Sequence, residues 1–257
     1  MAKDNPQSKS FRISENLIHV IDITSIISFI LALIQSYASI VPHKLFLFIA
    51  AFLLVIEKII SYNQVKFFDD AHKIRQTALL DNSFGEKRIQ NYDSGKYFDN
   101  ESIQFGEIKL LANIHENTLY TGKIIEKMLP RYYVISTTLF VILILQVCYS
   151  GINDFSSSLL NFVISSDFVI RTIKLRNLRK AAASVFEEAN KICSDFEKNS
   201  NTSLITRKII NIFVKYEEAV FESKIVLNEK VHSEQNLLLL HEWEGIKNTY
   251  KIYTVIS

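Results

Sequence analysis

The sequence is poor in the residues that form tight turns and disulfide frameworks. Its 257 residues include six glycines, three prolines and two cysteines. It has no alternating apolar and polar runs joined by Asn-Gly or Asp-Gly turns, so β-hairpins are not expected. The two cysteines, Cys148 and Cys193, lie in segments of different character and cannot easily pair, which indicates a reducing compartment. The composition therefore predicts a fold that is almost entirely helical.

Motifs that carry enzyme chemistry are also lacking. There is no phosphate-binding loop, nucleophile elbow, Cys-x-x-Cys or His-Glu-x-x-His. The nearest approach to a metal pattern, His241-Glu242 near Glu234, is typical of a solvated helix face. Asp22 and Asp167, at the edges of apolar segments, show no partner spacing suited to acid–base catalysis. We therefore expect no enzyme, no catalytic residue, no cofactor and no metal site.

Charged residues are few in four long apolar stretches, and this pattern is the strongest signal in the sequence. The four apolar segments are residues 17–40, 42–62, 132–153 and 155–170. They form two close pairs on either side of a polar stretch. No Asp, Glu, Lys or Arg lies between Asp22 and Lys44, and a bilayer core needs about 20 residues of helix. The pattern predicts a multi-pass membrane protein.

The second and fourth segments are less uniform than the other two. Lys44 and the pair Glu57 and Lys58 bracket the second, and we expect these charges to snorkel toward opposite interfaces. The fourth carries several serines, an asparagine and Asp167, so it either faces protein and water or does not cross. The short turn before it and the basic cluster after it favour crossing.

Basic residues set the expected orientation. They are Lys9 and Arg12 before the first segment, Lys66 and Lys73 after the second, and Arg171, Lys174, Arg176, Arg179 and Lys180 after the fourth. Such clusters mark the cytoplasmic side of a membrane. Both termini and the middle region are therefore expected in the cytoplasm, with only short turns facing outward.

The predicted fold is all-α, a four-helix transmembrane bundle of two hairpins with a helical cytoplasmic domain. That domain is built from the middle insertion and the C-terminal tail. The predicted parts are a cytoplasmic N-terminus (1–16), transmembrane hairpin 1 (17–62), a cytoplasmic insertion (63–131), transmembrane hairpin 2 (132–170) and a cytoplasmic helical tail (171–257).

Apolar periodicity predicts the helices of the cytoplasmic part. A stripe with a 3.6-residue period continues beyond 171, stops at 199–202 and resumes over 203–229, which predicts an antiparallel helical hairpin. The segment 233–250 holds the only tryptophan, Trp243, and is expected to pack on that hairpin. Turn-forming and aromatic residues without helical period predict a loop at 91–100.

Polar residues within the apolar segments form two helical stripes. The pore-lining candidates are Ser158, Asn161, Ser165 and Asp167 on the fourth segment, and Ser25 and Ser36 on the first. Small hydroxylated residues often only let membrane helices pack closely and hydrogen-bond. Alternatively, one stripe lines an aqueous pore, and this interpretation requires a homo-oligomer because four helices cannot enclose a useful conduit. Both interpretations stay open.

A second set of candidates concerns a signal or a protein partner. The candidates are Arg75, Lys87, Arg88, Tyr97 and Trp243. The basic residues lie close to the membrane, where attraction to anionic lipid and the setting of topology explain them. Alternatively, they bind a phosphorylated nucleotide signal whose bases stack on aromatic rings, while Trp243 contributes to a surface for a soluble partner.

The layout of the chain resembles the bacterial four-transmembrane effectors associated with second-messenger nucleotidyltransferases in antiphage signalling. The stretch Ala71-His72-Lys73-Ile74-Arg75-Gln76, followed by Asp81 and Phe84, is similar to the place where those effectors carry an Ala, Gln and Phe-Asp pattern. Their Trp-containing motif is replaced here by the loop 91–100, and a neighbouring defence-linked membrane family fits the layout as well.

The resemblance implies an effector in the bacterial inner membrane that stays silent until infection. A cytoplasmic signal or partner then activates it to form a pore or disrupt the membrane, which arrests the cell as in abortive infection. The expected partners are the lipid bilayer, further copies of the chain, and a cyclic nucleotide signal or a soluble defence protein, without direct nucleic-acid binding. The alternative is a non-conducting membrane anchor that recruits a soluble defence partner.

Overall fold

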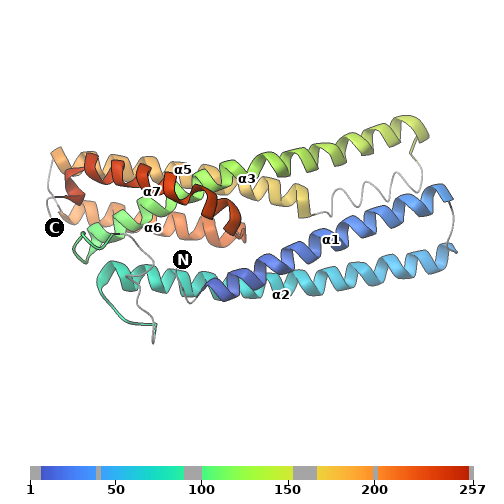
Figure 1. Ribbon diagram of the computed structural model, residues 1–257, viewed down its shortest axis with the longest axis horizontal. Helices are drawn as coiled ribbons and strands as arrows, with labels where there is room; N and C mark the ends of the chain where they lie inside the picture. Colours follow the sequence, from blue (N-terminus) through green and yellow to red (C-terminus); the bar gives the residue numbers. More distant parts are fainter. Residues whose placement is uncertain (1–6, 39–41, 90–99, 153–166, 199–201, 255–257) are drawn as a thin grey trace. The chain divides into compact units, whose positions relative to one another are not determined.

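The computed structural model describes residues 7–38, 42–89, 100–152, 167–198 and 202–254 (Figure 1). Of these residues 89% are helical, and none lies in a strand. The elements are α1 (Ser8–Ala38), α2 (His43–Phe84), α3 (Glu107–Ser150), α5 (Asp167–Lys198), α6 (Thr202–Ser223), α7 (Glu229–Thr249) and the 3-10 turn η2 (Lys251–Tyr253). The prediction of an all-α fold is confirmed.

Helices α2 and α3 are long because few helix-breaking residues interrupt them. α3 passes through Pro130, although proline cannot donate a backbone hydrogen bond. Gly85 and Gly151, which follow α2 and α3, have left-handed backbone with φ of 69° and 71°. At Gly85 an added Cβ would also lie 3.1 Å from the ring of Phe105. Glycine is therefore required where α2 ends.

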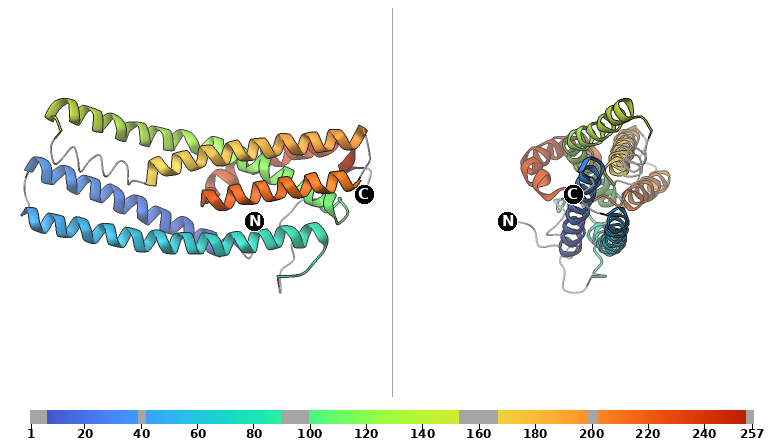
Figure 2. Two further views of the ribbon diagram at one scale, coloured as in Figure 1. Left: turned by 180° about the vertical axis from the view of Figure 1, so that it is seen from behind. Right: turned by 90° about the vertical axis from the view of Figure 1, so that its right-hand side faces the viewer.

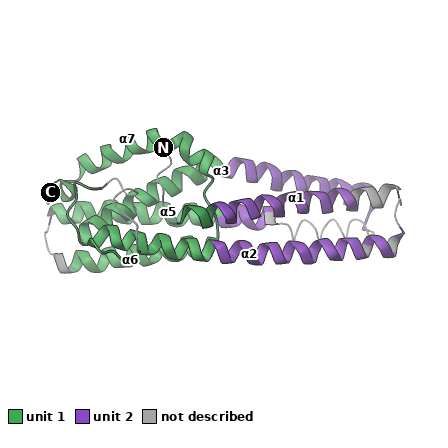
Figure 3. Ribbon diagram, turned by 60° about the horizontal axis from the view of Figure 1, so that its bottom comes forward, with its two compact units in different colours: residues 1–11, 68–128, 175–257 green, residues 12–67, 129–174 purple. Residues whose placement is uncertain are grey.

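The chain folds into two compact units, shown in different colours in Figure 3. Unit 1 comprises residues 1–11, 68–128 and 175–257, and unit 2 comprises residues 12–67 and 129–174. Helices α2, α3 and α5 each contribute residues to both units. The division falls close to the boundaries at 63, 131 and 171 that the sequence predicts between the transmembrane hairpins and the rest.

Unit 1 has a continuous apolar core. Fully buried members of the core include Leu79 of α2, Leu111 and Ile114 of α3, Val185 of α5, Ile209 of α6 and Trp243 of α7. Two ion pairs, Lys208–Asp195 and Lys215–Glu188, join α5 and α6 in antiparallel order, and the two helices run side by side (Figure 2). The predicted hairpin and the packing of Trp243 on it are confirmed.

Three helices of the described part are long and apolar enough to cross a membrane, namely α1, α2 and α3. Their apolar side chains are turned outward, and Phe48 and Val134 are 69% and 65% exposed. A soluble monomer rarely shows apolar surface of this extent, so the helices indicate a membrane protein. The fourth predicted segment, 155–170, lies almost entirely outside the described residues, and α5 begins at Asp167.

Within unit 2, α1 and α2 run antiparallel and side by side (Figures 1 and 2). The Ser14 hydroxyl of α1 accepts a hydrogen bond of 2.9 Å from Nε2 of Gln64 on α2. Further along the unit, Leu143 of α3 is buried in a small apolar cluster. The other members are Phe29, Leu139, Ile142 and Val169. Unit 2 therefore has an interior with both polar and apolar parts.

Candidate functional site

An ion pair joins α1 to α5 in the interior of unit 2. Nη1 of Arg171 lies 2.9 Å from Oδ1 and 3.1 Å from Oδ2 of Asp22. The Arg171 side chain is 9% exposed, and its guanidinium lies 5.8 Å from the ring centroid of Tyr132 on α3. Burying a charge is costly unless a partner compensates it, and Asp22 supplies that compensation.

A hydroxyl contact lies beside this ion pair and joins α3 to α5. The hydroxyls of Ser136 and Thr172 are 2.9 Å apart, and Thr172 also donates to the carbonyl oxygen of Phe168. Ser136 and Thr172 are both buried, as is Ser25, one turn beyond Asp22 on α1. Three helices thus direct polar groups into a unit whose outer surface is apolar.

The structure describes the side chain of only one of the pore-lining candidates, Ser25. Ser25 is buried in unit 2, as an interior position requires. Ser36 and Asp167 lie on helices α1 and α5, but their side chains are outside the described part. Ser158, Asn161 and Ser165 lie entirely outside the described residues. The predicted stripe on the fourth segment therefore stays a prediction.

Sequence reasoning missed the partner of Asp22. The sequence showed no partner spacing for Asp22 suited to acid–base catalysis, and in the structure Arg171 binds its carboxylate. The basic cluster that begins at Arg171 was interpreted as a topology signal, with no ion pair to Asp22 expected. The two residues lie 149 positions apart, so no local spacing could reveal the pair.

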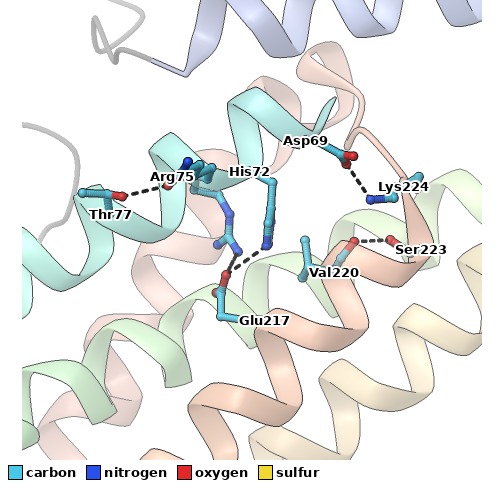
Figure 4. Close-up of polar contacts among 9 residues, drawn as sticks. Asp69, His72, Arg75, Thr77, Glu217, Val220, Ser223 and Lys224 are labelled. Atoms are coloured by element: carbon cyan, nitrogen blue, oxygen red, sulfur yellow. Dashed lines mark hydrogen bonds and ion pairs between the residues drawn. The ribbon is translucent and has the colours of Figure 1, made fainter. Parts of the chain in front are cut away.

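In unit 1, the signal-binding candidate Arg75 is held by a carboxylate. Its Nη2 lies 2.7 and 2.6 Å from the two carboxylate oxygens of Glu217 on α6 (Figure 4). The two side chains are only 11% and 4% exposed, and the guanidinium also lies 5.7 Å from the ring centroid of Tyr216. Arg75 therefore fixes α2 against α6, and its charge is already compensated.

His72 belongs to the same group of side chains and points from α2 toward Glu217 (Figure 4). Its Nε2 lies 3.6 Å from Oε2 of Glu217. Burial and the positive charges of Arg75 and Lys224 lower the pKa of His72 from 6.5 to about 4, against the opposing effect of Asp69. His72 is therefore neutral at neutral pH, and Arg75 supplies the positive charge that faces Glu217.

Lys224 makes a second connection between α2 and the end of α6. Its ammonium group pairs with Asp69 (Figure 4). The same group lies 3.2 Å from the ring centroid of Phe221. The backbone of Lys224 is left-handed, with φ of 52°, a conformation that ends helices and is rare for residues other than glycine. The contacts with Asp69 and Phe221 compensate for this conformation.

Among the candidates that the structure describes, none joins Arg75 in one site. Lys87 is exposed, and Arg88 is exposed and pairs with Glu86. Tyr97 lies outside the described residues. Trp243 is fully buried and donates a hydrogen bond of 3.0 Å to Oδ1 of Asn100, so its ring offers no surface to a partner.

Asn100 and Trp243 belong to a buried network of amides. Nδ2 of Asn100 donates to Asn113 and to Glu116 of α3, each at 2.8 Å. Asn113 in turn donates to Asn82 near the end of α2 at 2.9 Å. Buried amides need such partners, so the network fixes Asn100 in the core of unit 1.

A third buried group, in unit 1, contains residue types that are often catalytic. The Tyr253 hydroxyl lies 3.1 Å from Nδ1 of His115 and 3.3 Å from Sγ of Cys193. Burial raises the pKa of the Cys193 thiol to about 12 and lowers the pKa of His115 to about 4. The group anchors η2 in the core of unit 1, because His115 of α3 and Cys193 of α5 both contact the Tyr253 hydroxyl.

No set of three His, Cys, Asp or Glu side chains is placed to hold a metal ion in the part of the chain that the structure describes. No family model, curated protein or solved structure matches this chain. The function is therefore argued from the polar interior of unit 2 and from the contacts that fix α2 in unit 1.

Proposed function

We propose that this chain is a multi-pass effector of the bacterial inner membrane that opens an ion path as an assembly of several copies. The observation that carries the proposal is the ion pair of Asp22 and Arg171 within the apolar unit. Ionisable residues are expensive among membrane helices and are usually kept for ion pathways, proton relays or gating. The buried hydroxyls of Ser25, Ser136 and Thr172 extend the polar interior beyond the pair.

The proposed topology has both termini in the cytoplasm, with the apolar segments 17–40, 42–62, 132–153 and 155–170 as spans. Aromatic and basic side chains of unit 2 support this orientation. Tyr62 and Tyr133 are exposed, as are Lys66 and Arg131. Tyrosine is typical of the membrane–water interface, and Lys and Arg of its cytoplasmic side. All four lie near the ends of apolar segments that were predicted to face the cytoplasm.

Unit 1 is proposed to control the path. α2, α3 and α5 belong to both units, so a rotation or shift of these helices in unit 1 reaches unit 2 without an intervening loop. The Arg75–Glu217 and Lys224–Asp69 pairs hold α2 against α6 in the described conformation. The role in antiviral defence, and a cyclic nucleotide or soluble protein as the cue, rest on the resemblance of the layout.

The second candidate function is a non-conducting anchor that positions a soluble partner. The favouring observation is an apolar patch on α7, where Leu237 and the neighbouring Leu238 are largely exposed. Exposed leucines of this kind often contact another protein. In this case the sensitive surface would be α7, and the interior of unit 2 would tolerate substitution.

Membrane potential in living bacteria tests the choice between the two functions. The full chain is expressed with its neighbouring genes, phage is added, and the potential is followed with a voltage-sensitive dye. We expect depolarisation, and a variant with Ser158, Asn161 and Ser165 all changed to Leu should lack it at equal membrane insertion. An unchanged potential in every condition would contradict the pore and favour the anchor.

A further inference from the structure

The part of α2 that belongs to unit 2, residues 43–67, exposes positive charge without negative charge. It contains three lysines, Lys44, Lys58 and Lys66, and all three are exposed. Its only acidic residue is Glu57, whose side chain is buried, with 9% exposure, rather than turned to an interface as expected. The outer surface of this helix is therefore suited to an anionic partner.

Two of these lysines flank an exposed tyrosine at one end of the apolar segment 42–62. Lys58, Tyr62 and Lys66 are spaced by four residues, so they follow one side of the helix. Tyr62 is 73% exposed. At a rise of 1.5 Å per residue, each lysine begins roughly 6 Å along the axis from Tyr62. Lysine stems are long and flexible, so both ammonium groups can reach one anionic group beside Tyr62.

The two ammonium groups are available for such a contact. Among the residues that the structure describes, no carboxylate forms an ion pair with Lys58 or Lys66. Lys58 lies within the apolar segment, where an ammonium group is costly unless it extends to the interface or meets an anion. Extending toward the level of Tyr62 brings the Lys58 ammonium group to the place where tyrosine is typical of the membrane–water interface.

An apolar groove begins beside Lys58 and Tyr62. Its lining residues are Leu54, Val55, Lys58, Ile59 and Tyr62, and its volume is about 420 Å³. Leu54 and Val55 precede Lys58 by one turn, toward the centre of the apolar segment. The groove therefore has an aliphatic part on the hydrocarbon side and a cationic, hydroxyl-bearing end on the interface side. This order of groups matches the acyl chain and the phosphate of a phospholipid.

We propose that this side of α2 binds an anionic phospholipid, whose phosphate contacts Lys58, Tyr62 and Lys66 and whose acyl chain lies along the groove. We call these three residues and the groove the lipid site. In the proposed topology the lipid site lies in the cytoplasmic leaflet, where anionic headgroups attract lysine and arginine. The proposal requires α2 to lie in a membrane, but it does not require that ions pass.

Charge complementarity favours a lipid over a second copy of the chain on this face. Two copies in one membrane that pair through the same face by a two-fold rotation place identical residues at the same depth. Lys58 and Lys66 of one copy would then meet the same lysines of the other. Like charges close together repel each other, whereas an anionic headgroup compensates both lysines.

Native mass spectrometry of the full chain in mild detergent tests the proposal by measuring how much lipid each chain retains. Phosphatidylglycerol and phosphatidylcholine with the same acyl chains are titrated separately, and we expect tighter binding of the anionic lipid. Lys58→Gln should weaken phosphatidylglycerol binding about fivefold, which corresponds to about 1 kcal/mol. Lys58→Arg should keep the binding, because the positive charge stays. Circular dichroism checks that each variant is folded.

Lys44→Gln is the matched control, because Lys44 is an exposed lysine of the same helix with Phe48, not tyrosine, one turn later. It should leave phosphatidylglycerol binding unchanged. Equal binding of the two lipids, or equal effects of Lys58→Gln and Lys44→Gln, would overturn the proposal.

Two further outcomes would assign the face to another occupant and would also overturn the proposal. Displacement of the lipid by glycerol phosphate at equal concentration would mean that a free phosphate suffices and the groove contributes nothing. A dimer without retained lipid, lost in Lys58→Gln, would mean that a second copy covers the face. Neither outcome depends on conduction, so the ion path is tested separately by membrane potential.

Discussion

Arg171 of α5 and Asp22 of α1 form an ion pair across 149 positions of sequence, with Nη1 at 2.9 and 3.1 Å from the two carboxylate oxygens. Asp22 lies in the first apolar segment, and Arg171 directly follows the fourth. The pair therefore connects α1 and α5, which also share an apolar cluster through Phe29 and Val169. Removing one member leaves the other as an uncompensated charge in a buried place. The pair is therefore expected to matter both for stability and for the closed state.

Asp22→Asn is expected to raise ion leakage and to lower the free energy of unfolding by about 2 kcal/mol, since Arg171 stays buried without its counter-charge. The double variant Asp22→Arg with Arg171→Asp restores opposite charges. It should therefore recover most of the free energy of unfolding and bring ion leakage back toward the wild-type level. Thermal unfolding in detergent and dye release from vesicles measure the two effects. Glu126→Gln, which breaks the exposed pair with Arg179, is the control and should change little. A double variant as unstable as its single variants would contradict the role of the pair.

Glu217→Gln is expected to destabilise the fold by about 3 kcal/mol, because the Arg75 guanidinium stays buried beside a neutral amide. Replacing both residues by apolar ones, Arg75→Met with Glu217→Leu, should cost less than the single change. Arg88→Gln is the matched control, since Arg88 pairs with Glu86 on the surface. Thermal unfolding of the full chain measures the stability of each variant. Equal losses of stability in Glu217→Gln and Arg88→Gln would disprove the prediction.

The stability of the fold should fall as the pH drops from 6.5 toward 4. The pKa values of His72 and His115 are lowered to about 4 in the folded protein, mainly by burial. In this pH window the unfolded chain binds protons that the folded chain does not, so full stability is present above pH 6.5. Each histidine contributes a loss of at most about 3 kcal/mol.

Thermal unfolding midpoints at about pH 7.5 and about pH 5 measure this loss, and His115→Gln should make the difference between them smaller. His241→Gln serves as the control, because His241 is exposed on α7. The same pH dependence in the wild type and in His115→Gln would show that protonation of His115 does not contribute.

The Cys193 thiol should react slowly with iodoacetamide in the folded protein. Its pKa is raised to about 12 by burial, and its side chain is inaccessible in the core of unit 1. Thiolate is the reactive form, so both factors slow alkylation. Mass spectrometry of the labelled full chain gives the rate, with the guanidinium-unfolded chain as reference. Equal rates in the two states would contradict the burial of this residue.

Periodicity identified α5 and α6 and most residues of their inward faces, although Ile173 and Phe221 of the predicted stripes are exposed. The stripes beyond 171 and over 203–229 predicted α5 and α6 as a hairpin, and ion pairs such as Lys208–Asp195 confirm it. These features depend on neighbours three or four residues apart, which a single sequence contains. The same reasoning placed Trp243 on the hairpin.

Contacts between distant helices could not be predicted in this way. Arg75 was a candidate for contact with anionic lipid or a nucleotide signal, but Glu217, 142 positions away, compensates its charge. Glu57 was assigned to an interface because a charge at the end of an apolar run usually snorkels. Which neighbour a helix face meets depends on the tertiary arrangement, so the sequence alone did not reveal that Arg75 pairs with Glu217 or that the Glu57 side chain is buried.

Potassium release from vesicles tests the central claim most directly. The purified full chain is inserted into anionic vesicles loaded with KCl, insertion is verified by flotation, and release is followed with a K⁺-selective electrode for the wild type and Asp22→Asn. The account predicts release that rises more steeply than in proportion to the number of chains per vesicle, as an assembly of copies requires, and faster release by Asp22→Asn. Intact K⁺ gradients with both proteins fully inserted would contradict the ion path.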